Sequence, residues 1–335
     1  MISIVTPTWN ADEKLFNRVL KELQRQTYPK KLIEHIVLDA GSVNDTVKIA
    51  KKYGCKVIMK PELKVKEQVR ASLGIKMAKG KLVLILQSDN IITSKDWLER
   101  MVQPFLENKN VFCSYSAYNG YEKGMNATTR YGALFGSCEP TIYYLNKTEK
   151  IPMTQKFYNK GKVIKETENY YIVKFNKENL TTMGDNGHMF LKSAMDKVNK
   201  DPEKYVHLDA FAQLLKLKYD TYAVVKNDLI HMITPNIKRF VSRRVQVKDT
   251  YYDGWRGRRR YLVFDWNSRR DRINILKYLI YSFTFIYPFF ESVRGYIKIK
   301  DSAWFLHPML CFLMALGYSF SEVRWQVYRM VRSLR

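Results

Sequence analysis

The chain has 335 residues, 46% of them hydrophobic, so it is large enough to bury a real core and is not a disordered protein. Its formal net charge is +25, and residues 237–335 alone contain 20 Lys or Arg against 7 Asp or Glu. Such a basic excess predicts an anionic partner, which is nucleic acid, lipid headgroups or a substrate phosphate. The aromatic and aliphatic runs beside the basic residues favour lipid, and we expect no nucleic acid partner.

Short apolar strands alternate with amphipathic helices at the start of the chain. We predict strands at 2–6, 33–38, 57–59 and 82–87, and helices at 12–26, 44–53 and 65–78. Because this alternation requires a parallel sheet with right-handed crossovers, the sequence predicts an α/β fold.

The pattern weakens after the fourth strand, where VFCSYSAY (111–118) and YYIVKF (170–175) indicate two more strands. Helical periodicity returns at 187–198 and 202–217, followed by a strand at 221–225 and a loop that carries His231. Beyond Pro235, basic stretches lead into two apolar runs, 273–290 and 303–320. We therefore expect two domains, an α/β domain over residues 1–235 and a basic, aromatic-rich helical region over residues 236–335.

Two of the predicted strands end close to an acidic residue, Asp39 and Asp89. The carboxyl ends of parallel strands border the crevice where open α/β sheets bind ligands, so we expect both acids at one pocket. Gly41 allows close approach of the backbone to a ligand, and Ser88 and Asn90 offer groups that suit a ribose or a hard cation. The alternative at the first strand end is an ordinary strand–turn–helix with Asp45 or Asn44 as the N-cap, and the alternative for Asp89 is a cap of the helix that begins near Ser94.

Five segments then carry a resemblance: TPTWN (6–10), QTYP (26–29), DAGSVNDT (39–46), LGIKMAKG (73–80) and QSDN (87–90). In order and spacing they resemble the family 2 glycosyltransferases of the GT-A fold, over residues 1–235. The resemblance implies a Rossmann-like, mostly parallel sheet flanked by helices. It also implies inverting transfer from a UDP- or GDP-sugar, with a divalent cation, Mg²⁺ or Mn²⁺, at the diphosphate.

The resemblance assigns a donor site. Asp39 is expected to contact the nucleobase, while Pro7 and Trp9 line the same slot and Trp9 stacks on the base. Arg70 matches a position that helps to bind the nucleotide, with Lys66 one turn earlier on the same helix face. The alternative for these two cations is a solvated surface charge.

The expected metal site departs from the family pattern, in which the second strand end usually carries two aspartates two residues apart. This chain has Gln87, Ser88 and Asp89 there. Gln87 can hydrogen-bond a ribose but brings no charge. The cation would therefore depend on Asp89 and on His231, which resembles the histidine that completes the family's metal site; the alternative for His231 is a structural role.

The stretch TTMGDNGHMFLKSAM (181–195) resembles the family's acceptor loop, in which the backbone and Asp185 would face the acceptor; the alternative is a glycine turn before a helix, with Asp185 or Asn186 as the cap. Asp209 is the expected general base for the attacking hydroxyl, although Leu208 stands where the family shows the Glu of a Glu-Asp pair. If the acceptor is a polyprenyl phosphate, its oxyanion attacks without a base.

Each late apolar run has 18 residues, close to the ~20 that span a bilayer. Lys277 and Pro288 interrupt the first run, and His307 and Pro308 the second. We expect interfacial helices or a re-entrant hairpin rather than full crossing, with a buried helical pair as the alternative. The basic block 256–260 would then lie near anionic headgroups.

The sequence thus predicts a metal-dependent, inverting glycosyltransferase on the cytoplasmic side of the cell membrane, with a lipid-linked acceptor. The strand at Ile2 leaves no room for a signal peptide, and four scattered cysteines favour a reducing compartment. One alternative is a non-catalytic basic protein that binds membranes or nucleic acid. A second is a sugar-nucleotide pyrophosphorylase, although TPTWNADEK lacks the glycine-rich, basic phosphate loop that such an enzyme requires.

Overall fold

The computed structural model describes residues 1–253 and 258–333, which divide into two units. Unit 1 comprises residues 1–120, 149–151 and 157–232, and unit 2 comprises residues 121–148, 152–156 and 233–335. The chain enters unit 2 for the last time at residue 233, next to the expected boundary at residue 235. The units interleave, however, because 121–148 and 152–156 pack with the C-terminal residues.

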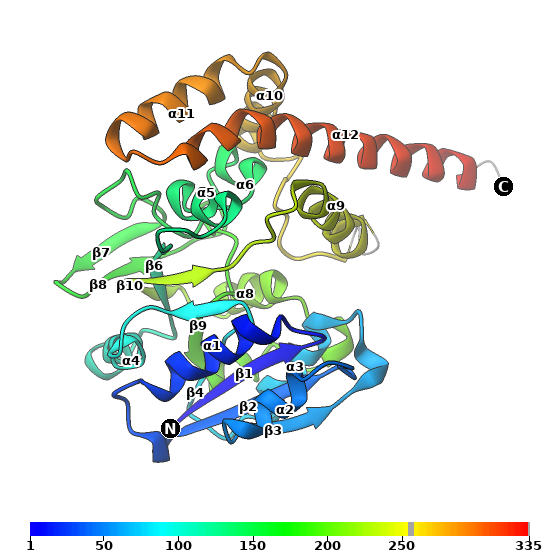
Figure 1. The fold of residues 1–335 in the computed structure, drawn as a ribbon. Coiled ribbons are helices and arrows are strands. Elements are labelled where there is room, and N and C mark those ends of the chain that lie inside the picture. Colours follow the sequence, from blue (N-terminus) through cyan, green and yellow to red (C-terminus); the bar gives the residue numbers. More distant parts are fainter. Residues whose placement is uncertain (254–257, 334–335) are drawn as a thin grey trace. The chain divides into compact units, whose positions relative to one another are not determined.

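Unit 1 is built on one mixed sheet with the strand order β3-β2-β1-β4-β9-β6-β10-β8-β7, and β5 pairs with β10. Figure 1 shows helices flanking this sheet. The pairs among β1 to β4 are all parallel, and antiparallel pairs appear beyond β4. The predicted α/β fold class is therefore confirmed. The elements are β1 (Ile2–Thr8), α1 (Glu13–Gln24), β2 (Ile33–Asp39), α2 (Thr46–Lys52), β3 (Lys56–Met59), α3 (Glu67–Met77), β4 (Leu82–Ile85), β5 (Asn90–Ile92), α4 (Trp97–Glu107), β6 (Cys113–Asn119), β7 (Lys162–Glu166), β8 (Tyr170–Lys174), β9 (His188–Leu191), α7 (Lys192–Met195), α8 (His207–Lys216) and β10 (Thr221–His231).

The centre of the sheet is dry on both faces. Every residue of β1 and β4 is buried, as expected for central parallel strands covered by helices on both sides. Helix α3 packs on β1 and β2, and a Cβ on Gly74 would lie 2.3 Å from Val5 Cγ1 and 2.7 Å from Leu38 Cδ1. The glycine therefore allows α3 to approach the strands whose ends form the site.

Two sequence expectations are wrong in this region. The helix predicted at 187–198 is instead strand β9 followed by the short helix α7, and β9 lies antiparallel between β4 and β6. A short apolar run such as HMFL does not distinguish strand from helix by periodicity, and the open position between two strands decided the outcome. The strand predicted at 221–225 continues to His231 through a register irregularity between Val225 and Asp228, so His231 ends β10 rather than lying in a loop.

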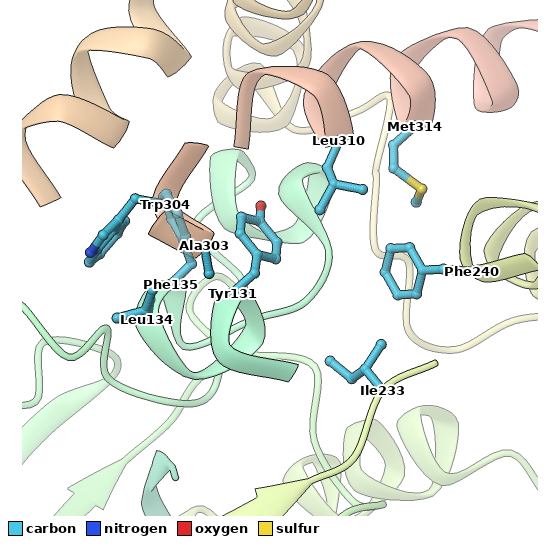
Figure 2. Packing of buried hydrophobic residues seen from close by; sticks show 9 residues of the cluster. All are labelled: Tyr131, Leu134, Phe135, Ile233, Phe240, Ala303, Trp304, Leu310 and Met314. Atoms are coloured by element: carbon cyan, nitrogen blue, oxygen red, sulfur yellow. The ribbon is translucent and has the colours of Figure 1, made fainter. Parts of the chain in front are cut away.

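Unit 2 is helical, with α5 (Ala127–Phe135), α6 (Pro140–Tyr144), α9 (Ile237–Val247), α10 (Arg269–Thr284), α11 (Ile286–Lys298) and α12 (Leu306–Ser333). Helix α12 lies against α5, α6, α9, α10 and α11. In Figure 2, Met314 of α12 points toward Phe240 of α9. The main core comprises Tyr131, Leu134, Phe135, Ile233, Phe240, Ala303, Trp304, Leu310 and Met314.

The two late apolar runs form helices of different shape. The first run breaks at Phe285, which adopts a left-handed conformation with φ 62°, and α10 and α11 are bent by 84° there. Lys277 lies inside α10, and Pro288 lies in the first turn of α11, where proline is tolerated. Among the described residues, Ser302–Val331 is the one helix long and apolar enough to cross a membrane, and 39% of its most apolar window is buried inside the protein.

Candidate active site

Asp39 ends β2, directly across from Thr8 at the end of β1. Its carboxylate is fully buried and accepts hydrogen bonds from Thr8 Oγ1 (2.9 Å), Ser42 N (2.7 Å) and Ser42 Oγ (2.6 Å). Gly41, with φ +78°, provides the sharp turn that brings Ser42 back to the carboxylate. Asp39 therefore has protein partners in the sheet and holds the turn after β2. Its expected contact with a nucleobase stays a prediction.

Trp9 follows β1 at the same sheet edge, and Pro7 is buried opposite Leu38. The Trp9 side chain is 40% exposed, and Lys64 Nζ lies 4.7 Å from its ring centroid in cation–π contact. The next residue, Asn10, adopts φ 46° and donates its N–H to Ser42 Oγ at 2.7 Å. The Trp9 backbone is thus tied to the turn that Asp39 holds, so the two residues share one sheet edge.

The two expected donor-site cations have different environments. Arg70 is 4% exposed, and its Nη1 donates to the carbonyls of Leu63 and Lys64. Lys66 is half-exposed and pairs with Glu203 Oε2 at 2.7 Å. Arg70 therefore supports the segment that carries Lys64, rather than being the solvated charge that the alternative expected.

The turn after β4 is organised by Asn90, whose side chain is fully buried. Its Oδ1 accepts the N–H of Gln87 at 3.2 Å, and its Nδ2 donates to Asp89 Oδ1 at 3.2 Å. Ser88 lies between them and is partly exposed. The sequence indicated Asn90 only as a polar neighbour, whereas the structure makes it a hydrogen-bond donor to Asp89.

The structure brings Asp89 and His231 together from distant parts of the sequence. His231 pairs with Asn90 in the β5–β10 ladder, and Met232 N donates to Asp89 O at 3.0 Å. As a result, His231 Nε2 lies 3.8 Å from Asp89 Oδ2, with side chains 22% and 40% exposed. No cluster of three or more His, Cys, Asp or Glu side chains suited to a metal ion occurs in residues 1–253 and 258–333. The two side chains are thus close together and partly open to solvent.

Asp185 lies in the loop before β9. Its Oδ1 accepts a hydrogen bond from Gln87 Nε2 at 2.5 Å. The loop is shaped by Gly184 (φ +110°) and Gly187 (φ +70°), and a Cβ on either would lie within 2.6 Å of a neighbouring side chain. A small pocket opens here, lined by Glu67, Gln68, Ala71, Ile85, Gln87, Gly184, Asp185, Tyr205 and His207.

Asp209, the expected base, lies in the first turn of α8 and is 8% exposed. The pocket is lined by His207 from the same turn and not by Asp209. His207 N and Nδ1 lie 3.1 and 2.9 Å from Gln68 Oε1, which ties the start of α8 to α3. The role of Asp209 stays a prediction.

A buried charged cluster beneath this loop could not be recognised from the sequence, because its members have no common motif. Glu149 Oε2 lies 3.1 Å from His188 Nε2, and the two form an ion pair when the imidazole is protonated. Glu149 Oε1 lies 3.2 Å from Lys150 Nζ. Burial alone would raise the pKa of Glu149, but the charges of His188 and Lys150 more than offset it and lower the pKa to about 2. This pair anchors the residue that directly follows the Gly184–Gly187 loop.

All four cysteines are free thiols. In the basic block 256–260, residues 256 and 257 lie outside the described residues, whereas Arg258 and Arg260 are exposed.

Comparisons with known proteins can now be set beside this geometry. Among curated proteins, the poly(ribitol-phosphate) beta-N-acetylglucosaminyltransferase TarS of Staphylococcus aureus is 33% identical over 101 residues, which are 28% of this chain and only 17% of TarS. The solved structure of S. aureus TarS aligns with a TM-score of 0.43 at 14% identity, covering 77% of this chain and 44% of that one. Glucosyl-3-phosphoglycerate synthase of Mycobacterium tuberculosis, solved with Mn²⁺ and UDP-glucose, aligns with a TM-score of 0.46 at 17% identity, covering 75% and 77%.

The family comparison covers more of the chain. The sequence model described as glycosyl transferase family 2 matches residues 3–198, well over half of the 335 residues. The match includes the ends of β1, β2 and β4 and the loop that carries Asp185, and it ends before His231. With this match, and with the resemblance carried by the strand-end segments, the chain belongs to glycosyl transferase family 2.

Proposed function

We propose that this glycosyltransferase moves a sugar, with inversion, from a nucleoside diphosphate sugar to an acceptor at a membrane surface, and that Asp89 and His231 hold a divalent cation on the diphosphate. The observation that carries the proposal is the 3.8 Å approach of His231 Nε2 to Asp89 Oδ2. Because Asp89 lies in the turn between β4 and β5 and His231 ends β10, the approach is a product of the fold and not of sequence neighbours.

The residues present suit such a cation. Mg²⁺ and Mn²⁺ accept carboxylate oxygen, and Mn²⁺ also accepts imidazole; sites that bind substrate phosphates commonly use only one or two protein ligands. A pair that is open to solvent leaves room for phosphate oxygens and water. When bound, the cation would neutralise charge on the departing diphosphate. Asn90 holds the Asp89 carboxylate in place for this role.

The nucleotide would bind along the ends of β1 and β2. Trp9 is exposed for stacking on a base, with Pro7 beneath the same edge, but Lys64 now covers the Trp9 ring and would have to move. Asp39 and Arg70 would act mainly by holding the two turns that border the slot. Ser88 and Lys66 are accessible enough to contact ribose or phosphate oxygens directly.

Transfer to a hydroxyl requires a group that accepts its proton, which contributes roughly two to four orders of magnitude in rate. Asp209 remains our assignment for this base. A phosphate acceptor would attack as an oxyanion and would make the base unnecessary.

The membrane part of the proposal is supported by the surface of unit 2. Large apolar side chains are exposed along α10 and α11, where soluble proteins rarely expose so many together: Ile273, Leu276, Ile280, Phe283, Phe285, Ile286, Tyr287, Phe289, Phe290, Tyr296 and Ile297. Exposed Lys277, Arg294 and Lys298 lie on the same helices. Apolar side chains beside cations suit the boundary between acyl chains and anionic headgroups. We therefore place the acceptor on a lipid at the cytoplasmic membrane face.

A second acceptor is favoured by one observation. The S. aureus relative is named as a transferase to poly(ribitol phosphate), which is a polymeric phosphate rather than a lipid. The basic excess of residues 237–335 suits either acceptor.

The test is release of nucleoside diphosphate from a panel of UDP- and GDP-sugars, with Mn²⁺ or Mg²⁺, using membrane lipid extract or poly(ribitol phosphate) as the acceptor. Asp89→Ala should lower turnover by at least about a hundredfold, a loss typical of removing a residue that stabilises transition-state charge. Asp45→Asn is the matched control, since Asp45 is an exposed acid in the other strand-end turn and pairs only weakly with Lys48. Unchanged turnover in Asp89→Ala would remove the cation assignment, and no turnover of any donor by the wild type would contradict the proposed function.

A further inference from the structure

We propose that α10 and α11 form a shallow wedge that enters one leaflet of an anionic lipid bilayer. The bend at Phe285 is the deepest point of the wedge, and the cations at its two outer ends contact lipid phosphates. The inference deepens the proposed function, since it names the partner surface and the way in which unit 2 binds it. The chain enters and leaves the bilayer on the same side.

The first observation is the shape of the helix pair. The axes of α10 and α11 differ in direction by 84°. At 1.5 Å per residue the two helices are about 24 Å and 20 Å long, so with equally sloping arms the bend lies roughly 15 Å deeper than the outer ends. The hydrocarbon of one leaflet is about 15 Å thick, half of the bilayer core. The bend therefore stays within one leaflet.

The second observation is the way in which charges are sorted between the two faces of the pair. Residues 269–298 contain two acids, Asp271 and Glu291, and both have partners inside unit 2. Asp271 is 3% exposed and lies 2.6 Å from Lys147 Nζ, while Glu291 accepts hydrogen bonds from Tyr143 and Tyr144. The six cations of the same segment are all exposed: Arg269, Arg270, Arg272, Lys277, Arg294 and Lys298.

The exposed charge of the helix pair is therefore positive. It is complementary to the headgroups of anionic lipids, each basic residue near such a surface adding about 1 kcal/mol of attraction. The same face on a second copy of the chain would meet it with like charge, which is unfavourable. A lipid surface thus fits this face better than self-association does.

The third observation is the order of side chains along the pair. Cations stand in the first turn of α10 and in the second half of α11, whereas the exposed side chains nearest the bend are apolar. Phe283, Ile286 and Phe290 are 49%, 63% and 64% exposed. This order puts cations at headgroup depth and aromatic rings at acyl depth. Lys277 lies between, and its long apolar stem allows the ammonium to reach the headgroups.

The bend is held by contacts within unit 2. Phe285 has φ 62°, which is uncommon for an aromatic residue. Its ring centroid lies 5.2 Å from that of Phe312 in α12, and the Phe283 centroid lies 5.8 Å from the same ring. At the outer end of α10, the Asp271 carboxylate accepts hydrogen bonds from Asp265 N and Lys147 Nζ. The wedge is thus preformed, and binding does not require it to become ordered.

Spin labels on single introduced cysteines test the depth of the wedge in vesicles of phosphatidylcholine mixed with phosphatidylglycerol. The variants are Ile273→Cys, Ile280→Cys, Ile286→Cys and Ile297→Cys, all at exposed positions. Val43→Cys, at a 91% exposed position of unit 1, is the aqueous control, and the wild type gives the background labelling. Thermal melting checks that each variant folds.

We expect the label at position 286 to lie about 10 Å deeper than the labels at 273 and 297, which should both lie near the phosphates of the outer leaflet. Equal depths at all four positions would mean that the helices lie flat, and a label at 297 that is reached only from inside the vesicle would mean that the chain crosses. Either result overturns the inference. Labels that all stay in water would overturn it too, together with the membrane part of the proposed function.

Co-sedimentation tests the cations. The triple variant Arg269→Gln/Arg270→Gln/Arg272→Gln should bind the anionic vesicles at least about tenfold more weakly, with little change in the weak binding to pure phosphatidylcholine. Lys48→Gln/Lys51→Gln/Lys52→Gln removes the same charge from exposed positions of α2 and should change binding by less than about twofold. Equal losses in the two variants, or no loss in either, would overturn the inference. Neither experiment contains a donor sugar, so an absence of turnover would contradict the proposed function alone.

Discussion

Replacing Glu149 by Gln is expected to destabilise unit 1 at neutral pH, and by less as the pH falls. The folded-state pKa of Glu149 is about 2, against an ordinary value of 4.5. At about 1.4 kcal/mol per pKa unit, the ionised carboxylate contributes roughly 3 kcal/mol at pH 7. Because the folded pKa is the lower one, this stability is present above pH 4.5 and is lost as the pH falls toward 2. About 1 kcal/mol should be gone at pH 4, and about 2 kcal/mol at pH 3.

The assay is hydrogen exchange of the β9 amides, corrected for intrinsic exchange rates, which reports the free energy of opening of unit 1 around His188. The difference between wild type and Glu149→Gln should shrink between pH 6 and pH 4. Glu203→Gln is the control, since Glu203 forms an exposed pair with Lys66 and should matter by less than about 1 kcal/mol at any pH. A difference that stays constant from pH 6 to pH 4 would refute the argument that the His188 and Lys150 charges stabilise a buried carboxylate.

Three more predictions concern the packing of α3 on the sheet, the turn that carries Asp89 and the exposed face of α11. Gly74→Ala places a methyl group against Val5 and should cost about 1–3 kcal/mol of unfolding free energy, measured by urea denaturation; a neutral effect would mean that α3 can move away from the sheet. Asn90→Ala should lower kcat at least about tenfold while the melting temperature falls by only a few degrees, because it removes a hydrogen bond that helps to orient the Asp89 carboxylate; an unchanged kcat would show that this hydrogen bond is not needed. Phe290→Ser should weaken co-sedimentation with anionic vesicles severalfold, and equal binding would show that the exposed face of α11 does not meet lipid.

The parallel half of the fold could be predicted because each element there has a strong local signal. The strand and helix patterns over residues 2–87 depend on apolar periodicity, and the family segments fall at the strand ends. Strand β9 was predicted as a helix because its short apolar run has no period of its own. Its conformation is set by β4 and β6, which lie on either side of it.

In the candidate site too, some features could be predicted from the sequence and others could not. Asp39 and Asp89 could be found from their place after apolar strands, and His231 from its resemblance to a family position. The hydrogen-bond partners of these site residues could not be predicted, because they come from parts of the chain that only the tertiary structure brings together. Nothing in the sequence indicates that Gln87 meets Asp185, or that Asp39 has its oxygens occupied by Thr8 and Ser42.

The break in the first late apolar run is another feature that the sequence did not predict. Pro288 lies in the first turn of α11, where proline is tolerated, but the residue that adopts the left-handed conformation is Phe285. Aromatic residues rarely adopt positive φ, so local propensity pointed away from this position. The interleaving of the two units along the chain likewise depends on packing that no local pattern reports.

The most direct test of the central claim is the affinity of UDP for the protein with and without Mn²⁺, measured by calorimetry for the wild type, Asp89→Asn and His231→Gln. We expect Mn²⁺ to tighten UDP binding at least about tenfold in the wild type and by less than about twofold in either variant, while binding without metal is similar in all three. An equal effect of Mn²⁺ in the wild type and both variants would contradict the assignment of Asp89 and His231 as the residues that hold the cation on the diphosphate.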